Sequence, residues 1–382
     1  MNKKVRKRIA IIAIGMICAG SIMTYSGYLL GGSKDISLNI KDGLVINNSK
    51  ERYKETISLE EFNSIEVECN SNIEFLKSDK YELEFDVPQS SGKISYSVKD
   101  KKLIIKQSVQ SKNNFNINLG FEENNQDKSY IKIYAPKEMK SKELKITSRF
   151  GNINVCPTES DVADINSYFG NITVDGLEAS STINMNMNNG KLNASNIKAQ
   201  NINVSNKYGG VKLENVNCNG LDVTLNNGKY IGNNVFTKNY TLKNSYGNND
   251  LSNSKSEILN IDIKNGELKI DSMNSGNANI VNNYGKVYAN EVQTNDLKMN
   301  LTNGNAEING EFKGTSEINS KYGNVLINTS LNKEDYDYDI KSDFGKIKIN
   351  DKQYEKQAER NEGSSNILKV KLNNGDVNLS FK

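Results

Sequence analysis

Residues 261–289 read IDIKNGELKIDSMNSGNANIVNNYGKVYA, and the two halves of this stretch repeat one pattern around Gly266 and Gly285. In each half an apolar residue stands five positions before the glycine, and two more stand two and four positions after it. Apolar residues at alternate positions on both sides of a glycine predict two β-strands, each with one buried face. The glycine between them predicts a tight corner with a positive φ angle.

This pattern recurs through the last two-thirds of the chain at nearly constant spacing. The corner glycines are Gly151, Gly170, Gly190, Gly209, Gly228, Gly247, Gly266, Gly285, Gly304, Gly323, Gly345 and Gly375. A fixed period of this length is typical of stacked repeats, in which each copy buries its apolar face only against its neighbours. We therefore predict an all-β, parallel β-helix (β-solenoid) of about twelve coils over residues 146–382, with adjacent strands about 4.8 Å apart.

The residue before each glycine indicates that the coils are of two kinds. Phe150 and Phe169 come first, and from residue 189 to residue 322 asparagine then alternates with tyrosine. The full repeat is therefore a 38-residue double unit. Either consecutive 19-residue coils differ, or one large coil carries two kinds of corner. We favour 19-residue coils, because a 38-residue coil would need a very wide core filled with side chains.

The tyrosines of this alternation form the one candidate binding surface. They are Tyr208, Tyr246, Tyr284 and Tyr322. On a regular stack they share one corner and form a column, and exposed aromatic columns stack on sugar rings or pack against another protein. Alternatively, each ring covers the corner glycine and the edge of the core. We favour the second interpretation.

Small polar residues predict hydrogen bonding from coil to coil at a second corner. Five positions after the glycine stand, for example, Asp271, Asn290, Asn309 and Asn328. Such side chains form ladders along other stacked β structures. The last interval between glycines is longer and contains a polar stretch near residues 351–365, which we expect to be a loop inserted into the stack.

The amino terminus predicts a membrane anchor. Residues 1–8 carry five basic residues, and residues 9–30 form an uncharged run long enough to span about 30 Å as a helix. The basic segment should stay in the cytoplasm, which places the rest of the chain outside the cell membrane. A cleaved signal peptide is the alternative, although its apolar region is usually only about 7–15 residues long. Residues 31–55 are expected to be a linker.

Several kinds of chemistry are excluded by composition. The chain has no histidine, so catalysis by Ser–His–Asp or Cys–His and zinc sites with histidine ligands are not available to it. Beyond the anchor, Cys69, Cys156 and Cys218 are odd in number and lack paired metal-ligand spacing, although one disulfide is possible. We expect no cofactor and no metal. The net charge is +3, or −2 without residues 1–8, and so gives no footprint for nucleic acid.

Carboxylates are the remaining route to catalysis. With 19-residue coils, Asp250 lies near Glu267, Lys269 and Asp271, and Lys269 occupies the position of Asp250 one coil later. Sugar-cleaving enzymes work with pairs of acidic residues. An exposed ion pair explains the same residues, and we favour that interpretation.

Residues 56–145 are less regular but also predict strands, and they carry a resemblance to a known family. The segments are Glu61–Ile65, Ser95–Val98 with Leu103–Ile105, Ile131–Pro136 and Ser148–Ile153. In this order they resemble the bacterial β-strand-repeat putative adhesins, a family of unknown function related to head-GIN domains. The match covers roughly residues 56–382. The resemblance implies a right-handed β-helix at the cell envelope and transfers no catalytic residue.

These observations favour a non-enzymatic, membrane-anchored solenoid that displays a long surface to a protein or glycan partner at the cell surface. An accessory or sensor subunit of an envelope-stress system is the first alternative. A polysaccharide-active enzyme that uses Asp250, Glu267 or Asp271 is the second.

Overall fold

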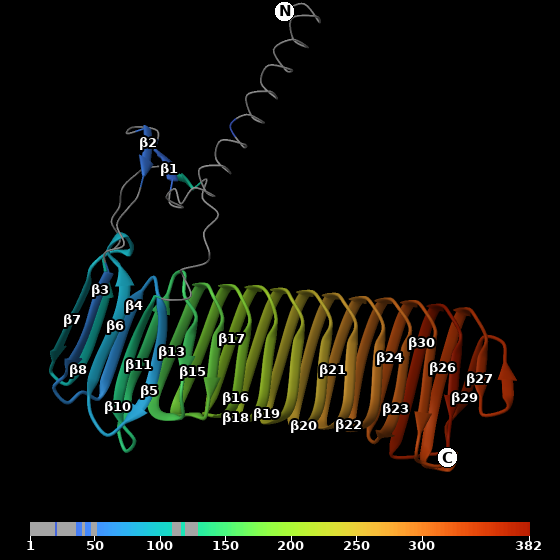
Figure 1. Cartoon of the computed structure of the whole chain (residues 1–382). Helices are drawn as coiled ribbons and strands as arrows, with labels where there is room; N and C mark the ends of the chain where they lie inside the picture. The colour runs from blue at the N-terminus through green and yellow to red at the C-terminus, as the bar shows by residue number, and fades with distance from the viewer. Residues whose placement is uncertain (1–19, 21–35, 40–42, 47–51, 109–115, 119–128) are drawn as a thin grey trace, which may run out of the picture.

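The computed structural model describes residues 20, 36–39, 43–46, 52–108, 116–118 and 129–382 (Figure 1). In this part of the chain nearly all regular structure is β-strand, and 28 strands join in one continuous sheet wound into a solenoid. Two single-turn 3-10 helices, η1 (Gln89–Ser91) and η3 (Lys333–Asp335), interrupt it. A separate antiparallel sheet contains β1 (Ile36–Asn39), β2 (Gly43–Ile46) and β9 (Asn116–Asn118).

The middle of the solenoid consists of parallel strands in a strict register. They are β13 (Thr158–Phe169), β14 (Ile172–Asp175), β15 (Leu177–Asn189), β16 (Leu192–Lys198), β17 (Asn201–Tyr208), β18 (Val211–Asn227), β19 (Tyr230–Tyr246), β20 (Asn249–Asn265), β21 (Leu268–Tyr284), β22 (Val287–Asn303), β23 (Ala306–Phe312), β24 (Thr315–Tyr322) and β25 (Val325–Thr329). Leu251 pairs with Ile270 and Ile270 with Ala289, so a coil advances by 19 residues. The step from β14 to β16 is one residue longer, with Ile172 paired to Leu192. The 19-residue coil is confirmed, and consecutive coils differ.

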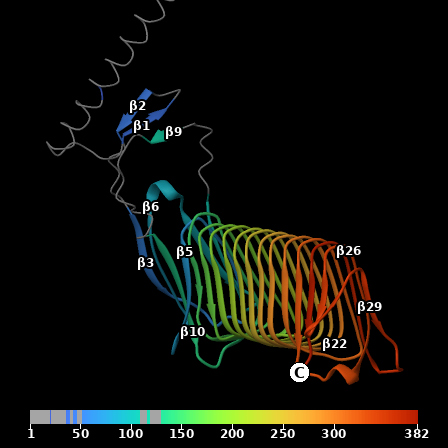
Figure 2. The same ribbon diagram turned by 90° about the vertical axis from the view of Figure 1, so that its right-hand side faces the viewer.

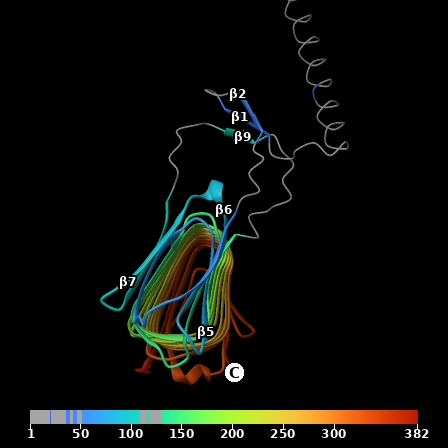
Figure 3. The same ribbon diagram turned by 60° about the vertical axis from the view of Figure 1, so that its left-hand side comes forward.

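The core lies inside the coils, which superpose closely around an elongated interior (Figures 2 and 3). Alternate residues of each strand are buried, as in β21, where Leu268 and Ile270 point inward and Lys269 outward. A coil alone would leave this apolar row in water. Each coil therefore depends on its neighbours for burial, which at about 25 cal/mol per Å² is the main stabilising term.

Glycine is required at the corners mainly because neighbouring coils approach each other closely there, and less because of an unusual φ angle. A Cβ atom on Gly266 would lie 2.0 Å from the carbonyl oxygen of Gly247, one coil earlier. Gly228 would make the same clash at 1.8 Å with Gly209, although its φ is not positive. The prediction of a positive φ is therefore wrong for Gly228, Gly151 and Gly345. Glycine is needed at these three corners because the neighbouring backbone occupies the space where a Cβ atom would lie.

The second corner bends one residue later than the predicted ladder position. Six residues after the glycine, a residue with φ between 49° and 57° turns the chain: Asn196, Asn215, Asn234, Asn253, Ser272 and Glu291. Asparagine adopts this left-handed conformation more easily than most residues. The predicted ladders are present, as when Asn290 Nδ2 donates to Asp271 Oδ1 at 2.9 Å and Asn328 Nδ2 to Asn309 Oδ1 at 2.6 Å.

One coil departs from the apolar pattern, and its contacts explain why. Gly232 stands where other coils have an apolar side chain, and its missing Cβ would lie 2.6 Å from the hydroxyl of Tyr240 and 2.7 Å from that of Tyr230. The two hydroxyls hydrogen-bond each other in the core. The next coil has buried Asn249, whose Oδ1 accepts from Asn244 Nδ2 at 2.8 Å. Every buried polar group in this set therefore has a partner.

At the carboxyl end the order of rungs in space differs from their order in the chain. The strands are β26 (Tyr336–Phe344), β27 (Ile347–Ile349), β28 (Lys352–Tyr354), β29 (Gln357–Arg360), β30 (Asn366–Asn374) and β31 (Val377–Ser380). Strand β30 lies between β24 and β26, parallel to both, and β31 lies between β25 and β27. The rung of Gly375 therefore separates the rungs of Gly323 and Gly345.

This arrangement corrects two expectations. About ten turns, from Gly151 to Gly323, follow chain order at 19-residue spacing, in place of the predicted twelve. The residues near 351–365 are not a simple inserted loop, because they contain β28 and β29, which pair antiparallel with β27 and β26. These two strands cover the edge of the last rung, and an uncovered edge would be a site of aggregation.

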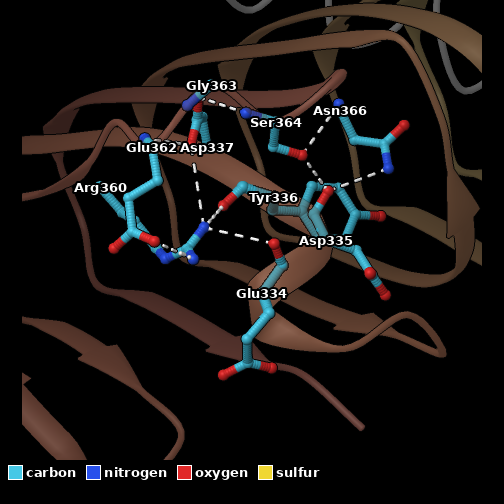
Figure 4. A network of polar contacts seen from close by, with 9 residues as sticks. All are labelled: Glu334, Asp335, Tyr336, Asp337, Arg360, Glu362, Gly363, Ser364 and Asn366. Atoms are coloured by element: carbon cyan, nitrogen blue, oxygen red, sulfur yellow. Dashed lines mark hydrogen bonds and ion pairs between the residues drawn. The ribbon is translucent and has the colours of Figure 1, made fainter.

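A polar network holds this C-terminal cap together (Figure 4). The carboxylate of Asp337 accepts hydrogen bonds from the backbone N–H groups of Glu362, Gly363 and Ser364 at 2.8, 3.0 and 3.0 Å. These donors, with the N–H of Glu362 first, hold the pKa of Asp337 below its ordinary value. Arg360 Nη1 donates to the carbonyl oxygen of Tyr336 at 2.6 Å.

The amino-terminal end uses the same exchange of rungs. The strands are β3 (Arg52–Ser58), β4 (Ser64–Cys69), β5 (Asn72–Ser78), β6 (Glu82–Pro88), β7 (Ile94–Lys99), β8 (Lys102–Gln107), β10 (Tyr130–Pro136), β11 (Lys140–Ser148) and β12 (Ile153–Val155). The rung of β4 and β5 lies between the rung of β8 and β10 and that of β11 and β12. Antiparallel strands β7, β6 and β3 lie outside.

The predicted anchor at residues 9–30 falls, apart from Gly20, outside the described residues. Within the ranges given above, none of the helices has the length and apolar character needed to cross a bilayer. Strand β3 begins inside the stretch that the sequence suggested as a linker.

Candidate functional site

The residues that precede the corner glycines form one continuous row, which we call the corner ridge. In spatial order it consists of Phe150, Phe169, Asn189, Tyr208, Asn227, Tyr246, Asn265, Tyr284, Asn303, Tyr322, Asn374 and Phe344. The exchange of the last two rungs places Asn374 between Tyr322 and Phe344. Beyond Phe169, aromatic and asparagine residues therefore alternate without interruption to the end of the stack.

The rings of the corner ridge point into solvent and do not close over the glycines, so the covering role favoured from the sequence is wrong. The four predicted tyrosines are between 54% and 59% exposed, and Phe344 is 75% exposed. Seven of the twelve exposed large apolar side chains in the described residues belong to this row. Phe150 and Phe169 stack face to face, with centroids 5.6 Å apart. Exposed aromatic side chains gathered on one line are typical of a binding surface.

The backbone beneath the ridge is rigid. Two residues before a ridge tyrosine, a buried asparagine reaches across to the previous coil, as when Asn206 Nδ2 donates to the carbonyl oxygen of Gly190 at 3.0 Å. Asn282 does the same to Gly266 at 3.2 Å. The N–H of every corner glycine from Gly170 to Gly323 donates to the neighbouring coil, for example from Gly266 to the carbonyl oxygen of Tyr284 at 2.8 Å. From Phe169 to Phe344 the aromatic rings are therefore presented at fixed intervals of two rungs, about 10 Å.

A groove of about 560 Å³ runs beside the ridge along the rungs of Gly247 to Gly375. Its lining includes Lys286, Tyr288, Asn305 and Asn324, from the positions that follow the corner glycines. Tyr288 is 36% exposed and places a further ring on the groove floor. The sequence did not predict this groove, because nothing in one coil shows which outward side chains meet across six coils.

The predicted carboxylate cluster is only partly assembled. Asp250 and Glu267 both line the groove, whereas Asp271 lies outside it and accepts a hydrogen bond from Asn290. Asp250 stands in register with Lys269, as expected, but its ion pair at 2.6 Å is with Lys229 of the preceding coil. The described residues contain no group of three or more acidic or cysteine side chains able to hold a metal ion.

The three cysteines outside the predicted anchor are free thiols. Cys69 and Cys218 are buried, and Cys156 is partly buried. Burial raises the pKa of each thiol above its ordinary value, which disfavours the reactive thiolate. The disulfide that the sequence left possible is not formed.

A family model decides which proteins this chain belongs with. The model for Toastrack DUF4097 matches residues 62–230 and again residues 229–380. The chain is a member of the Toastrack DUF4097 family. The resemblance to bacterial β-strand-repeat adhesins is confirmed. Comparison with curated proteins gives no match.

Solved structures with a similar fold come from several bacteria. A putative adhesin from Bacteroides fragilis is 14% identical, with 87% of this chain and 98% of that chain covered and a TM-score of 0.25. A putative cell adhesion protein from Clostridium sporogenes is 12% identical, with coverage of 87% and 100% and a TM-score of 0.19. A putative lipid binding protein from Parabacteroides distasonis is 12% identical, with coverage of 87% and 98% and a TM-score of 0.21.

Proposed function

We propose that this Toastrack DUF4097 protein is a non-enzymatic binding protein of the cell envelope, tethered by residues 9–30, whose right-handed solenoid presents the corner ridge outside the cytoplasm. The observation that carries the proposal is the row of seven exposed aromatic rings on one corner. Burying such rings against a partner is favourable, and a monomeric protein seldom leaves so many on one line without a use.

The rigidity of the stack supports a role in adhesion or contact with envelope material. About ten coils in chain order, held by ladders of backbone hydrogen bonds, form a stiff support of roughly 50 Å. Such a support spaces several weak contacts at fixed intervals. Binding to a repetitive partner then gains from multivalency, because each later contact is intramolecular.

The test compares two sets of substitutions in the full-length protein, purified with detergent. The first changes Tyr208, Tyr246 and Tyr284 to alanine. The control changes Tyr96, Phe236 and Ile258, which are 41–49% exposed on other faces, to alanine. We expect isolated cell envelopes to retain the native and control proteins and to lose the ridge variant. Equal retention of the two variants would end the proposal.

The proposed tether has its own measurement. Residues 9–30 should keep the native chain in the membrane fraction after a high-salt wash. A cysteine-specific, membrane-impermeant label should react slowly with Cys156, which is only partly buried, in intact cells. Labelling that first requires permeabilised cells would place the solenoid in the cytoplasm and contradict the proposed location.

A further inference from the structure

The residues that border the corner ridge carry a concentrated positive charge. We define the ridge flanks as the residue before each ridge residue and the residue after each corner glycine. The basic residues of the flanks are Arg149, Lys191, Lys207, Lys229, Lys264, Lys286, Lys321 and Lys346, and the acidic residues are Glu267, Asp343 and Asp376. Eight against three gives the flanks a net charge of +5. The chain from residue 9 onward carries −2, so the remainder outside the flanks carries −7.

Most of this positive charge is free to bind a ligand. Arg149 pairs with Glu68 at 3.6 Å, and Lys229 pairs with Asp250 at 2.6 Å. Within the part of the chain that the structure describes, the other six flank lysines have no ion-pair partner, and all six are exposed. Elsewhere on the surface lysines commonly pair with a neighbouring carboxylate, as Lys212 does with Glu214 at 2.7 Å.

We infer that the corner ridge binds an extended anionic polysaccharide, one whose sugar rings carry carboxylate or phosphate groups. Aromatic faces stack on sugar rings, the asparagines between them offer amide donors and acceptors for hydroxyl groups, and the flank lysines attract the acidic groups. The inference rests on the proposed function and deepens it, because it names the chemistry of the partner that the ridge binds.

The spacing of the charges favours a polysaccharide over a nucleic acid. Six free lysines over twelve rungs correspond to one charge per about 10 Å. A nucleic-acid strand carries a negative charge about every 3.4 Å, so most of its phosphates would lie against the ridge unpaired. A polymer with an acidic group on only some of its sugars matches the sparse row. The rings likewise recur every second rung, at an interval longer than adjacent stacked bases would need.

The groove beside the ridge gives such a chain a place to lie. Lys286, Asn305 and Asn324 line it next to the ridge, and Tyr288 adds a ring to its floor. A strand-like peptide partner is less suited to this corner, because the backbone N–H and C=O groups of each coil already pair with the neighbouring coils. A partner must therefore bind through side chains, which suits a polymer of sugar rings and hydroxyl groups.

Four probes test the inference on the full-length protein in detergent, by calorimetry. They are a partly methyl-esterified oligogalacturonate, its full methyl ester of equal length, a glucan bearing phosphate monoesters on some of its sugars, and oligodeoxythymidine. We expect one or both acidic glycans to bind more tightly than the ester and the oligonucleotide. Raising the salt from about 0.1 M to about 1 M, which shortens the Debye length from about 10 Å to about 3 Å, should weaken that binding.

Matched variants locate the site. Changing Lys207, Lys264 and Lys321 to glutamine removes three free flank lysines and should weaken binding about tenfold, whereas the same change at Lys238, Lys255 and Lys298 on other faces should leave it unchanged. Tyr284→Ala should weaken it about fivefold. Circular dichroism checks that the variants are folded.

Each remaining outcome overturns the inference in a distinguishable way. Equal binding of the methyl ester would show a neutral glycan site, and the proposed envelope function would survive. Tightest binding of the oligonucleotide would show a nucleic-acid site instead. If the flank and ridge variants bind the acidic glycans as tightly as the native protein does, the binding site lies elsewhere. No binding of either acidic glycan, with envelope retention intact, would leave the proposed function standing and refute this partner.

Discussion

The regular middle of the solenoid and its two ends differ in how the order of the rungs in space relates to their order in the chain. From Gly170 to Gly323 the order of coils in the chain is their order in space, and each corner packs against the one before it. At the carboxyl end the chain passes over one rung, adds antiparallel strands outside, and returns to fill the space it left. At the amino end it forms the rung of β4 and β5 first, then the outer rung of β8 and β10, and crosses back to β11 and β12. A parallel stack has no intrinsic end, so stopping it requires a change of strand direction.

The difference shows which parts of a repeat protein can vary. The middle depends on one geometric condition, a backbone without a Cβ at each corner. The ends depend on specific side-chain contacts, such as Asp337 with three backbone donors. A defect in the middle should therefore affect neighbouring coils on both sides, whereas a defect in a cap should remain local.

The largest expected effect comes from Gly247→Ala in the middle of the stack. The new Cβ would lie 2.1 Å from the carbonyl oxygen of Gly228, at a φ of 140°. We expect a loss of about 3–5 kcal/mol in the free energy of unfolding, measured by urea denaturation. Gly210→Ala is the control, because its Cβ would have an ordinary contact of 3.4 Å with Lys229.

The same substitution at the end rung sharpens the comparison. In Gly345→Ala the Cβ would lie 1.9 Å from the oxygen of Gly375. This clash is as severe as that in Gly247→Ala, but we expect only the last rung and its cap to open. Hydrogen exchange should therefore increase in the last rung and the cap, while β20 and β21 stay protected. An equal loss of protection in both regions would show that the stack unfolds as one unit and would refute the distinction.

Next in size is the second corner, tested by Asn234→Ala. Asn234 has a φ of 55°, and its Nδ2 donates to Asn215 Oδ1 at 3.0 Å. Alanine tolerates this backbone poorly and removes the hydrogen bond, so we expect a loss of about 1–2 kcal/mol in thermal unfolding. Asn234→Gly keeps the backbone relaxed and should recover more than half of it. A glycine variant as unstable as the alanine variant would assign the effect to the ladder.

The C-terminal cap should respond to pH through Asp337. Its pKa in the folded protein lies below the unfolded value, so the folded state binds fewer protons. The cap is therefore fully stabilised above the unfolded pKa of about 4 and loses that stability as pH falls through the folded value. Hydrogen exchange of β29 should rise over this range in the native protein.

The matched variants separate this carboxylate from others on the same strand. Asp337→Asn should give fast exchange of β29 already at neutral pH, with little further change on acidification. Asp339→Asn, two residues along β26, should keep the native profile. If acidification opens β21 before β29, the cap is not the weaker region.

The smallest effect on stability is expected from the corner ridge. Tyr284 is 54% exposed, so Tyr284→Ala should change the free energy of unfolding by less than about 0.5 kcal/mol. A loss above about 1.5 kcal/mol in thermal unfolding would show that the ring covers the core edge after all. The ridge would then be part of the packing of the middle coils and not a surface for a partner.

The alternation of aromatic residues and asparagine before the corner glycines indicates that the last two rungs are exchanged, which the spacing of the glycines does not show. In chain order the ridge would end Tyr322, Phe344, Asn374, with two aromatic rungs adjacent. Two residues earlier, Ser320 and Ser342 would likewise be adjacent, before Leu372. Placing the last rung between the other two restores both alternations. The long final interval suggested an insertion, and only the pairing of β30 with β24 and β26 showed where the last rung lies.

Other features of the structure could not be predicted from the sequence of a single coil. In the sequence, Gly232 interrupts a row of apolar residues. In the structure, the space that an apolar side chain would take there is filled by the hydroxyl groups of Tyr230 and Tyr240. The sequence favoured tyrosine rings that cover the edge of the core, whereas the structure exposes them. Their exposure follows from the fixed backbone of the corner, which turns the side chain outward while the asparagine two residues before it, such as Asn282, points inward.

By itself the sequence determined the 19-residue period and the two faces of every strand, because a strand with alternating apolar residues can bury them in only one register. It also determined the corner glycines. The choice of a 19-residue over a 38-residue coil was favoured by the sequence and decided by the strand pairing. The tertiary structure decided how the stack stops, since that depends on which strand edges are left to be covered. It also decided where the surface charge gathers, because the flank lysines come from coils that become neighbours only when the chain has wound.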